Sequence, residues 1–243
     1  MKDLFELLTE EITFEEAANY FKEKIPMRAS EFYKLADEYK SLAFTVSGYS
    51  KAQVLKKFHD ELLKAIEEGT TMGDFKDKMN EFLVKKGYEG ITNFQADNIF
   101  RTNIQTAYQV GHYKQMITPE ILKYRPYWQY DAVNDRHTRP SHLAMDGRVF
   151  RAYDPIWDIW YPPNGFRCRC GVKTLSERQV KERGLKVETG APIAAEADGK
   201  FTNILPDPDF ANNPAKVAFT PDLKDYPDSI RKVFERRGLS KGK

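Results

Sequence analysis

The residues Tyr-Pro-Pro-Asn-Gly-Phe-Arg-Cys-Arg-Cys-Gly-Val (161–172) place a stiff turn directly before an extended segment. Pro162 and Pro163 have fixed backbone φ angles, which makes the start of this turn rigid. Gly165 follows two residues later, and glycine adopts positive φ at little cost. The Pro-Pro-Asn-Gly sequence therefore predicts a tight turn that leads into a strand.

The segment that follows, residues 167–175, has an extended pattern with two cysteines two positions apart. In a strand, such residues project to the same face, so we expect the thiols of Cys168 and Cys170 to point the same way. Arg169 should then point to the opposite face. Since neighbours at this spacing in a strand rarely form a disulfide, we expect a reduced pair.

A second informative stretch, Asn-Asp-Arg-His-Thr-Arg-Pro-Ser-His-Leu-Ala-Met-Asp-Gly (134–147), precedes the first. Its polar start predicts a turn, Pro140 suits the first turn of a short helix, and Gly147 suits its end. The flanking residues 124–133 and 148–150 are bulky and aromatic, which favours strands. Together these segments predict a small α+β unit.

The first half of the chain predicts a series of helices, each with a single apolar face. Capping-box spacings mark several starts, at Thr13/Glu16, Ser50/Gln53 and Thr92/Gln95. Thr71 and Ser30 are further expected helix starts, and Ser176 is expected to cap a short helix later in the chain.

We therefore predict an α+β protein with three regions. Residues 1–120 form a helical region, and residues 121–190 form an α+β unit with a short antiparallel sheet. Residues 191–243 form an irregular proline-rich arm that ends in a basic helix and tail from Ser229, with Arg231, Lys232, Arg236, Arg237, Lys241 and Lys243.

Composition excludes several classes of protein. The net charge is only +2, so no global field favours nucleic acid or an anionic membrane. Two cysteines are too few for a disulfide scaffold. The early acidic residues are unlike a signal peptide, and no apolar run reaches the roughly 20 residues that span a bilayer. We expect a protein made in a cytoplasm, with no membrane partner.

Residues 135–147 and 161–172 together resemble the phage Mu F-like head morphogenesis family, whose members are minor head proteins. The family pattern is Asp-x-Arg-x-Arg-Pro-x-His, a glycine a few residues on, and then Pro-Pro-Asn-Gly-aromatic-x-Cys-Arg-Cys. Arg101-Thr102 looks like the Arg-Thr that precedes this core, and residues 210–214 are similar to its downstream Asn-Pro motif. The resemblance covers roughly residues 91–218.

This resemblance implies a head-morphogenesis protein of a tailed phage or prophage, present in few copies near the portal vertex of the procapsid or virion head. The implied partners are portal, coat or scaffolding proteins, with packaged DNA as a further candidate. Neither a catalytic activity nor a small-molecule substrate is implied.

The motif residues themselves allow three interpretations. In the first, arginine forks bind carboxylates and hold the loops in a buried salt-bridge and hydrogen-bond network. The residues of this structural network are Arg101, Asp131, Asp135, Arg136, Arg139, His142, Gly147, Pro162, Pro163, Gly165 and Arg169.

In the second interpretation, His142, Cys168 and Cys170 bind zinc, which takes thiolates and imidazoles tetrahedrally. Similar relatives have a further cysteine where this chain has Arg139, so His137 or Asp131 must supply a fourth ligand. Such a site could staple a small nucleic-acid-binding module. The alternative is that both cysteines are buried packing groups without metal.

In the third interpretation, Asp135, His137 and His142 hold a hydrolytic metal ion, as in a nuclease or toxin. Only one copy of each kind of candidate metal ligand is present, and no second acidic motif follows. We therefore favour the structural network and expect that the protein is not an enzyme.

Three large aromatic residues, Trp157, Trp160 and Tyr161, have two open interpretations. They either form an interaction anchor, as aromatic residues do at interface hot spots, or they cap the small core. The basic C-terminal run is expected to be a solvated tail, with DNA contact as the alternative.

Overall fold

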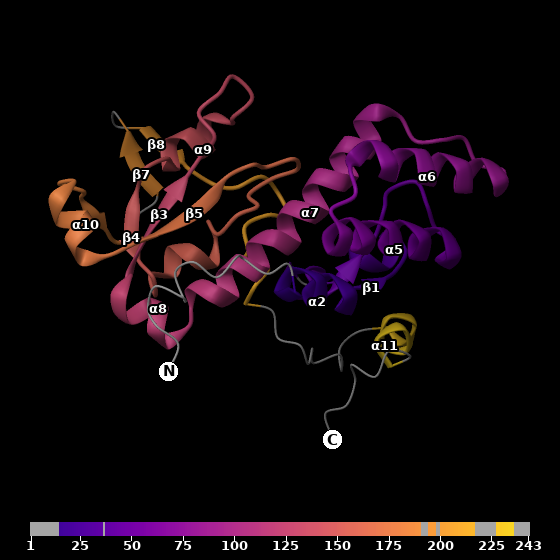
Figure 1. The fold of residues 1–243 in the computed structure, drawn as a ribbon, viewed down its shortest axis with the longest axis horizontal. Helices are drawn as coiled ribbons and strands as arrows, with labels where there is room; N and C mark the ends of the chain where they lie inside the picture. The colour runs from indigo at the N-terminus through magenta and orange to yellow at the C-terminus, as the bar shows by residue number, and fades with distance from the viewer. Residues whose placement is uncertain (1–14, 36, 191–193, 198–199, 217–226, 236–243) are drawn as a thin grey trace.

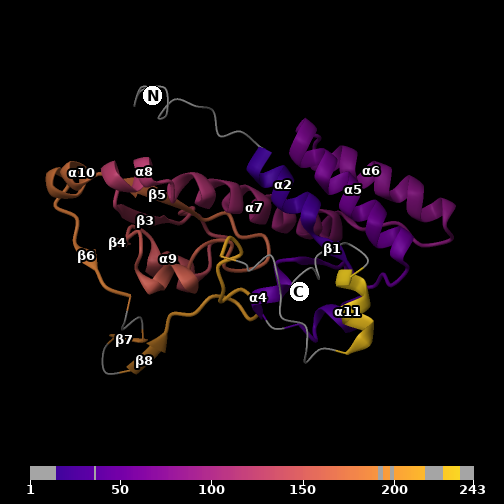
Figure 2. The ribbon, with the colours of Figure 1, turned by 90° about the horizontal axis from the view of Figure 1, so that it is seen from below.

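The computed structural model describes residues 15–35, 37–190, 194–197, 200–216 and 227–235. A helical part and a sheet-containing part lie at opposite ends of an elongated molecule (Figure 1). One long helix, α7 (Asn93–Met116), runs from one part to the other. The view from below keeps the same separation (Figure 2). The predicted α+β fold with a helical N-terminal half is confirmed.

The helical part consists of α2 (Glu15–Glu23), α5 (Ala52–Glu68), α6 (Met72–Lys85) and the first two-thirds of α7. Their apolar faces meet in one core that includes Phe21, Phe58 and Met79. Each helix is amphipathic, so this shared core is what keeps them together.

Of the helix starts predicted in the first half of the chain, Thr71 and Thr92 are confirmed, and Ser50 and Ser30 are wrong. Thr71 and Thr92 each accept a hydrogen bond from the backbone N–H three residues on, and each forms a capping box. The predicted cap at Ser50 is wrong, because α5 is preceded by Lys51, whose side chain makes no capping hydrogen bond. Thr13 lies outside the described residues.

The single helix predicted from Ser30 is also wrong. This region contains two one-turn helices, α3 (Ala29–Phe32) and α4 (Asp37–Lys40), and two short parallel strands. The strands are β1 (Ile25–Pro26) and β2 (Ala43–Phe44). The backbone N–H of Ile25 donates to Leu42 O at 2.8 Å, so strand pairing takes the bonds that a helix would have used.

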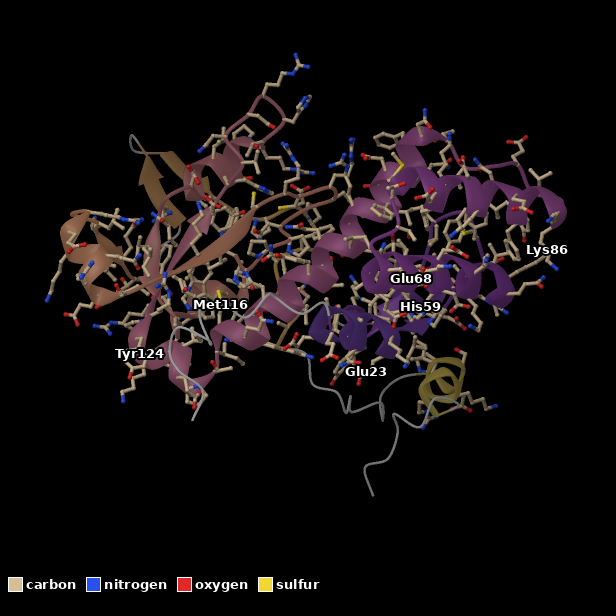
Figure 3. The ribbon with its side chains drawn as sticks, viewed as in Figure 1. Glu23, His59, Glu68, Lys86, Met116 and Tyr124 are labelled. Carbon is tan, nitrogen blue, oxygen red and sulfur yellow. The ribbon has the colours of Figure 1, made fainter. Side chains whose placement is uncertain are left out.

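Helix α7 belongs to both cores. Ala96 and Ala107 are buried in the helical core, whereas Tyr113 and Met116 are buried in the core of the α+β unit. Figure 3 shows this arrangement, with His59 of α5 among the helices and Met116 at the sheet end of α7. The helix therefore links the two halves by packing as well as by chain connection.

The α+β unit is built on a four-stranded sheet with the order β5-β3-β4-β6. Strand β3 (Tyr127–Asp131) pairs antiparallel with β4 (Val149–Arg151) and with β5 (Gly171–Leu175). Strand β6 (Val187–Glu188) adds a parallel edge to β4, so the expected antiparallel sheet is mixed.

Short helices connect these strands. They are α8 (Pro119–Tyr124), α9 (Pro140–Met145), a 3-10 turn at Pro155–Asp158, and α10 (Glu177–Glu182). The predicted short helix at Pro140 and the Ser176 cap are both confirmed. Strand β5 begins only at Gly171, so the two cysteines lie in the loop before the strand and not in it.

The C-terminal region is more regular than predicted. It contains a hairpin of β7 (Ala194–Ala197) and β8 (Lys200–Asn203), where the sequence indicated only an irregular arm. The arm then passes along the α+β unit, and α11 (Asp228–Glu235) lies beside the N-terminal helical part (Figures 1 and 2).

A helix is present where the sequence predicted one, but within α11 Arg231 and Lys232 are balanced by Asp228 and Glu235, so its described part is not basic. Its Ile230 is buried with Ile25 and Leu42. The tail residues Arg236, Arg237, Lys241 and Lys243 lie outside the described residues. Among the residues that the structure describes, no helix combines the length and the apolar character needed to cross a bilayer. The boundaries 1–120, 121–190 and 191–243 stay a prediction.

Candidate metal centre

Three metal-ligating side chains meet between α9 and the loop before β5. His142 lies on α9, and Cys168 and Cys170 follow the Pro-Pro-Asn-Gly turn; their exposed fractions are only 2%, 4% and 2%. Nδ1 of His142 lies 3.8 Å from Sγ of Cys168 and 3.4 Å from Sγ of Cys170. The three atoms all lie within 4.8 Å of one another.

The two thiols affect each other's protonation. A hydrogen bond from Cys170 lowers the pKa of the Cys168 thiol to about 7, although burial acts in the other direction. The same hydrogen bond raises the pKa of Cys170 well above its ordinary value. One thiolate is therefore accessible near neutral pH, and a cation bound to both sulfurs would displace the second proton.

Arg169, between the two cysteines, holds the loop in place. Its guanidinium donates two hydrogen bonds to the Asp135 carboxylate, both at 2.7 Å, in a fork geometry. Asp135 also accepts from the backbone N–H of His137 at 2.9 Å. The Arg169 fork, followed by these hydrogen bonds, holds the pKa of Asp135 well below its usual range.

Arg139 forms a second connection, to the C-terminal arm. Its guanidinium donates to Phe166 O at 2.9 Å and pairs with Asp207 at 2.9 Å. This pair lies directly against Gly165, where an added Cβ would be 2.4 Å from an Asp207 carboxylate oxygen. The Asp207 and Arg139 side chains thus occupy the space that a side chain at position 165 would need.

The remaining polar motif residues do not join a single buried network. Asp131 pairs with Lys173 at 2.7 Å on the surface, and Arg136 contacts the His137 ring. Arg101 shares Asp97 with Arg167, whose ion pair spans 2.6 Å. The network predicted as one unit is therefore several separate, partly exposed pairs.

Glycine and proline positions of the motif act through the backbone. Gly147 has a φ of +74°, and its N–H donates to Tyr130 O at 2.9 Å, which returns the chain from α9 to the sheet. Pro162 and Pro163 are joined by a cis peptide bond, and both are buried. These residues shape the loops that carry the cysteines.

A small cavity lies against the three candidate ligands, and His137 forms part of its wall. The carboxylate of Asp131, the other candidate for a fourth ligand, instead forms an ion pair with Lys173. In the described part of the chain, the triad is the one group of three or more histidine, cysteine, aspartate or glutamate side chains close enough to share a metal ion. Asp135 is not in that group, so the set expected for a nuclease does not converge here.

The three aromatic residues with open roles are buried. Trp157, Trp160 and Tyr161 lie in the core of the α+β unit with Trp128 and Tyr130. Trp160 also packs edge-on against the His142 ring, with centroids 5.9 Å apart. Their burial favours the core-capping interpretation over the interaction anchor.

Several residues that support the site were not singled out from the sequence. Asn164 is fully buried and accepts a hydrogen bond from Tyr130 OH at 2.9 Å. Asn213 on the arm donates to Trp157 O at 2.9 Å, and Gln105 on α7 donates to Cys170 O at 2.9 Å. The two asparagines lie inside the quoted motifs, whereas the helical pattern around Gln105 gave no signal.

Comparison with known proteins adds a family relationship. Residues 56–173 match the family described as Phage Mu protein F like protein. The chain is 38% identical to the Mu-like prophage FluMu F protein of Haemophilus influenzae over 170 residues, which is 65% of this chain and 41% of that protein. It is 32% identical to the putative capsid assembly protein F of Escherichia phage Mu, over 91% of this chain and 58% of that protein.

The chain thus spans about half the length of the curated relatives it matches. No solved structure matches it. The family match runs from α5 into β5, so it contains α7, the His142 helix and both cysteines. On these matches, the chain belongs to the phage Mu F-like protein family.

Proposed function

We propose that this chain is a minor head protein that takes part in phage head assembly. The observation that carries the proposal is its similarity to the putative capsid assembly protein F of phage Mu, which extends over 91% of the chain. In this proposal the protein acts by binding other proteins, and the motif residues maintain the fold that presents the binding surface.

We place this action at the portal vertex of the procapsid, with portal, coat or scaffolding proteins as partners. The support is the family pattern in residues 135–147 and 161–172. DNA contact is a weaker proposal, since the whole chain has a net charge of only +2.

One surface of the molecule suits a protein partner. A cleft of about 490 Å³ lies between the segment around β2, the first half of α7, the Pro-Pro-Asn-Gly turn and the arm near residue 210. Tyr33, Phe94 and Phe166 line it and are exposed. Large exposed aromatic side chains around a concave surface are typical of interfaces.

The cleft also contains polar atoms that could bind a main chain. Thr45 Oγ1 and Asn98 Oδ1 are buried, line the cleft and have no hydrogen-bond partner. An unsatisfied buried polar atom is costly, and a partner that supplied the missing bond would remove that cost. We therefore propose an extended segment of another head protein as the occupant.

The proposal is tested by disrupting the gene in the phage or prophage that encodes the chain. We expect a loss of DNA-filled heads in electron micrographs, with recovery when the wild-type chain is supplied in trans. Normal numbers of filled heads without the protein would refute a role in assembly.

A variant of the cleft separates surface contact from folding. Phe94→Asp places a charge on the cleft wall, and Val84→Asp on α6 is the control, because both side chains are 65% exposed and Val84 does not line the cleft. We expect Phe94→Asp alone to lose co-sedimentation with procapsids and to fail in complementation. Equal behaviour of the two variants would remove the cleft from the proposal.

A further inference from the structure

We propose that His142, Cys168 and Cys170 bind one zinc ion, with His137 as the fourth ligand. Zinc lies about 2.3 Å from a thiolate sulfur and about 2.0–2.1 Å from an imidazole nitrogen. In a regular tetrahedron these lengths give a sulfur-to-nitrogen separation of about 3.6 Å. The two observed separations, 3.8 and 3.4 Å, lie on either side of that value.

The chemistry of the donor set also fits zinc. Two thiolates balance the charge of the ion, so the bound site would be electrically neutral and would tolerate burial. Soft thiolates with imidazole select zinc over magnesium or calcium, which prefer oxygen.

The ligands are held in place before any ion arrives. Cys170 is fixed through its carbonyl, which accepts from Gln105 Nε2 at 2.9 Å, and the loop is fixed through the Arg169–Asp135 fork. His142 comes from a different element, α9, 26 residues before Cys168. A zinc ion would therefore cross-link α9 to the loop before β5.

We name His137 as the fourth ligand because it lines the same small cavity as His142, Cys168 and Cys170. The backbone N–H of His137 donates a hydrogen bond to the Asp135 carboxylate, which holds the loop that carries His137. A site of two cysteines and two histidines is a closed structural arrangement, which agrees with a role in stability. This inference is independent of the proposed role in head assembly.

The first experiment uses the full wild-type chain, purified without a histidine tag. We expect one zinc ion per chain by plasma mass spectrometry. Because the chain has only two cysteines, titration with an organic mercurial should release that ion when both have reacted, as detected by a zinc dye. Absence of zinc after growth and purification in zinc would overturn the proposal.

Cobalt supplies a second readout on the folded wild-type protein. Cobalt exchanged into the site should give thiolate-to-metal charge-transfer bands and the intense visible bands of tetrahedral coordination. A folded protein that shows neither spectrum with cobalt in excess would also overturn the proposal.

Variants then assign the ligands. We expect Cys168→Ser, Cys170→Ser and His142→Ala each to lose the bound zinc, whereas the control His112→Gln on α7 keeps one ion per chain. His137→Gln should weaken zinc binding at least tenfold, and unchanged binding would overturn its assignment. Zinc retained in the cysteine variants would refute the site itself.

Discussion

At the scale of single residues, the Pro-Pro-Asn-Gly turn depends on the side chain of Asn164. Its carbonyl oxygen accepts from Tyr130 OH, and its backbone carbonyl accepts from the N–H of Asp207 on the arm at 3.0 Å. The residue is fully buried, so water cannot replace these bonds. Asn164 thus connects the turn to the sheet through its side chain and to the arm through its backbone carbonyl.

Replacing the side-chain amide of Asn164 should therefore destabilise the fold. We expect Asn164→Ala to lower the free energy of unfolding by about 1–3 kcal/mol, because the buried Tyr130 hydroxyl loses its acceptor. The control Asn212→Ala, at a partly exposed position, should cost less than about 0.5 kcal/mol. Denaturant titration measures both, and a similar loss in the two variants would contradict this role.

A double-mutant cycle sharpens the test of Asn164. Tyr130→Phe removes the hydroxyl, so the combination with Asn164→Ala should cost clearly less than the sum of the two single changes. Strict additivity would show that the Tyr130–Asn164 hydrogen bond does not stabilise the fold.

Lys24 is a second residue with a measurable consequence. Its ammonium group is buried, donates to Ser41 O at 2.7 Å and to Ala43 O at 3.2 Å, and burial lowers its pKa to about 7. In the unfolded chain the pKa of lysine is about 10.4. Above pH 7 the unfolded state therefore binds more protons at this residue than the folded state does.

It follows that the stability contributed at Lys24 rises with pH between about 7 and 10. The slope approaches at most about 1.4 kcal/mol per pH unit. We expect the free energy of unfolding of the wild type to rise relative to that of Lys24→Met over this range. Parallel pH profiles of the two proteins would contradict a depressed pKa at Lys24.

The residues of the candidate metal centre were predictable only in part. The spacing of Cys168 and Cys170 correctly indicated thiols on the same side, and the motif correctly grouped them with His142. The ion-pair partners were not predictable, since Asp97 and Asp207 approach Arg167 and Arg139 only through tertiary folding. Sequence spacing carries no information on such contacts.

At the scale of elements, α7 packs unusually closely against α2 at Gly111. An added Cβ there would lie 3.1 Å from the backbone nitrogen of Ala17, which is tighter than ordinary contacts. Small residues permit two helices to approach in this way, and Gly111 is buried at the crossing. The glycine therefore has a packing role that outweighs its low helix propensity.

We expect Gly111→Leu to lower the free energy of unfolding by about 1–3 kcal/mol, because the larger side chain forces α2 and α7 apart. The control is Gly73→Ala on the exposed face of α6, where the nearest atom would lie at 3.5 Å. That change should be neutral or stabilising by up to about 1 kcal/mol. Thermal or denaturant unfolding distinguishes the two, and a neutral Gly111→Leu would contradict close helix packing.

The elements show where local sequence rules succeed. Thr71 and Thr92 were found correctly because capping depends on residues only three positions apart. At Ser50 the rule failed, since burial of Val54 and Leu55 fixes the first turn of α5 without a side-chain cap. The region after Ser30 failed for a similar reason, because its apolar residues pack against the distant Ile230.

At the scale of the whole molecule, two connections join the halves. Helix α7 contributes to both cores, and the C-terminal arm crosses the α+β unit before α11 packs on the N-terminal part (Figures 1 and 2). A boundary near residue 120 therefore divides the sequence at a point where packing is continuous. Because packing continues across this boundary, we expect the two halves to stabilise each other and not to fold as independent units.

Unfolding should accordingly be a single transition for both halves. The chain has three tryptophans, Trp128, Trp157 and Trp160, and all three are buried in the α+β core, so their fluorescence reports that half alone. Circular dichroism at helical wavelengths reports mainly the N-terminal half. We expect the two signals to give coincident thermal transitions, which is the standard test of two-state unfolding.

A substitution far from the tryptophans makes this test decisive. Phe58 is fully buried in the helical core, and Phe58→Ala should cost about 3–5 kcal/mol. If α7 couples the halves, this variant shifts the fluorescence transition to lower temperature by as much as the helical transition. A fluorescence midpoint unchanged from the wild type would mean that the α+β unit unfolds independently. In that case the two ends of α7 would unfold in separate transitions, each together with the core in which it is buried.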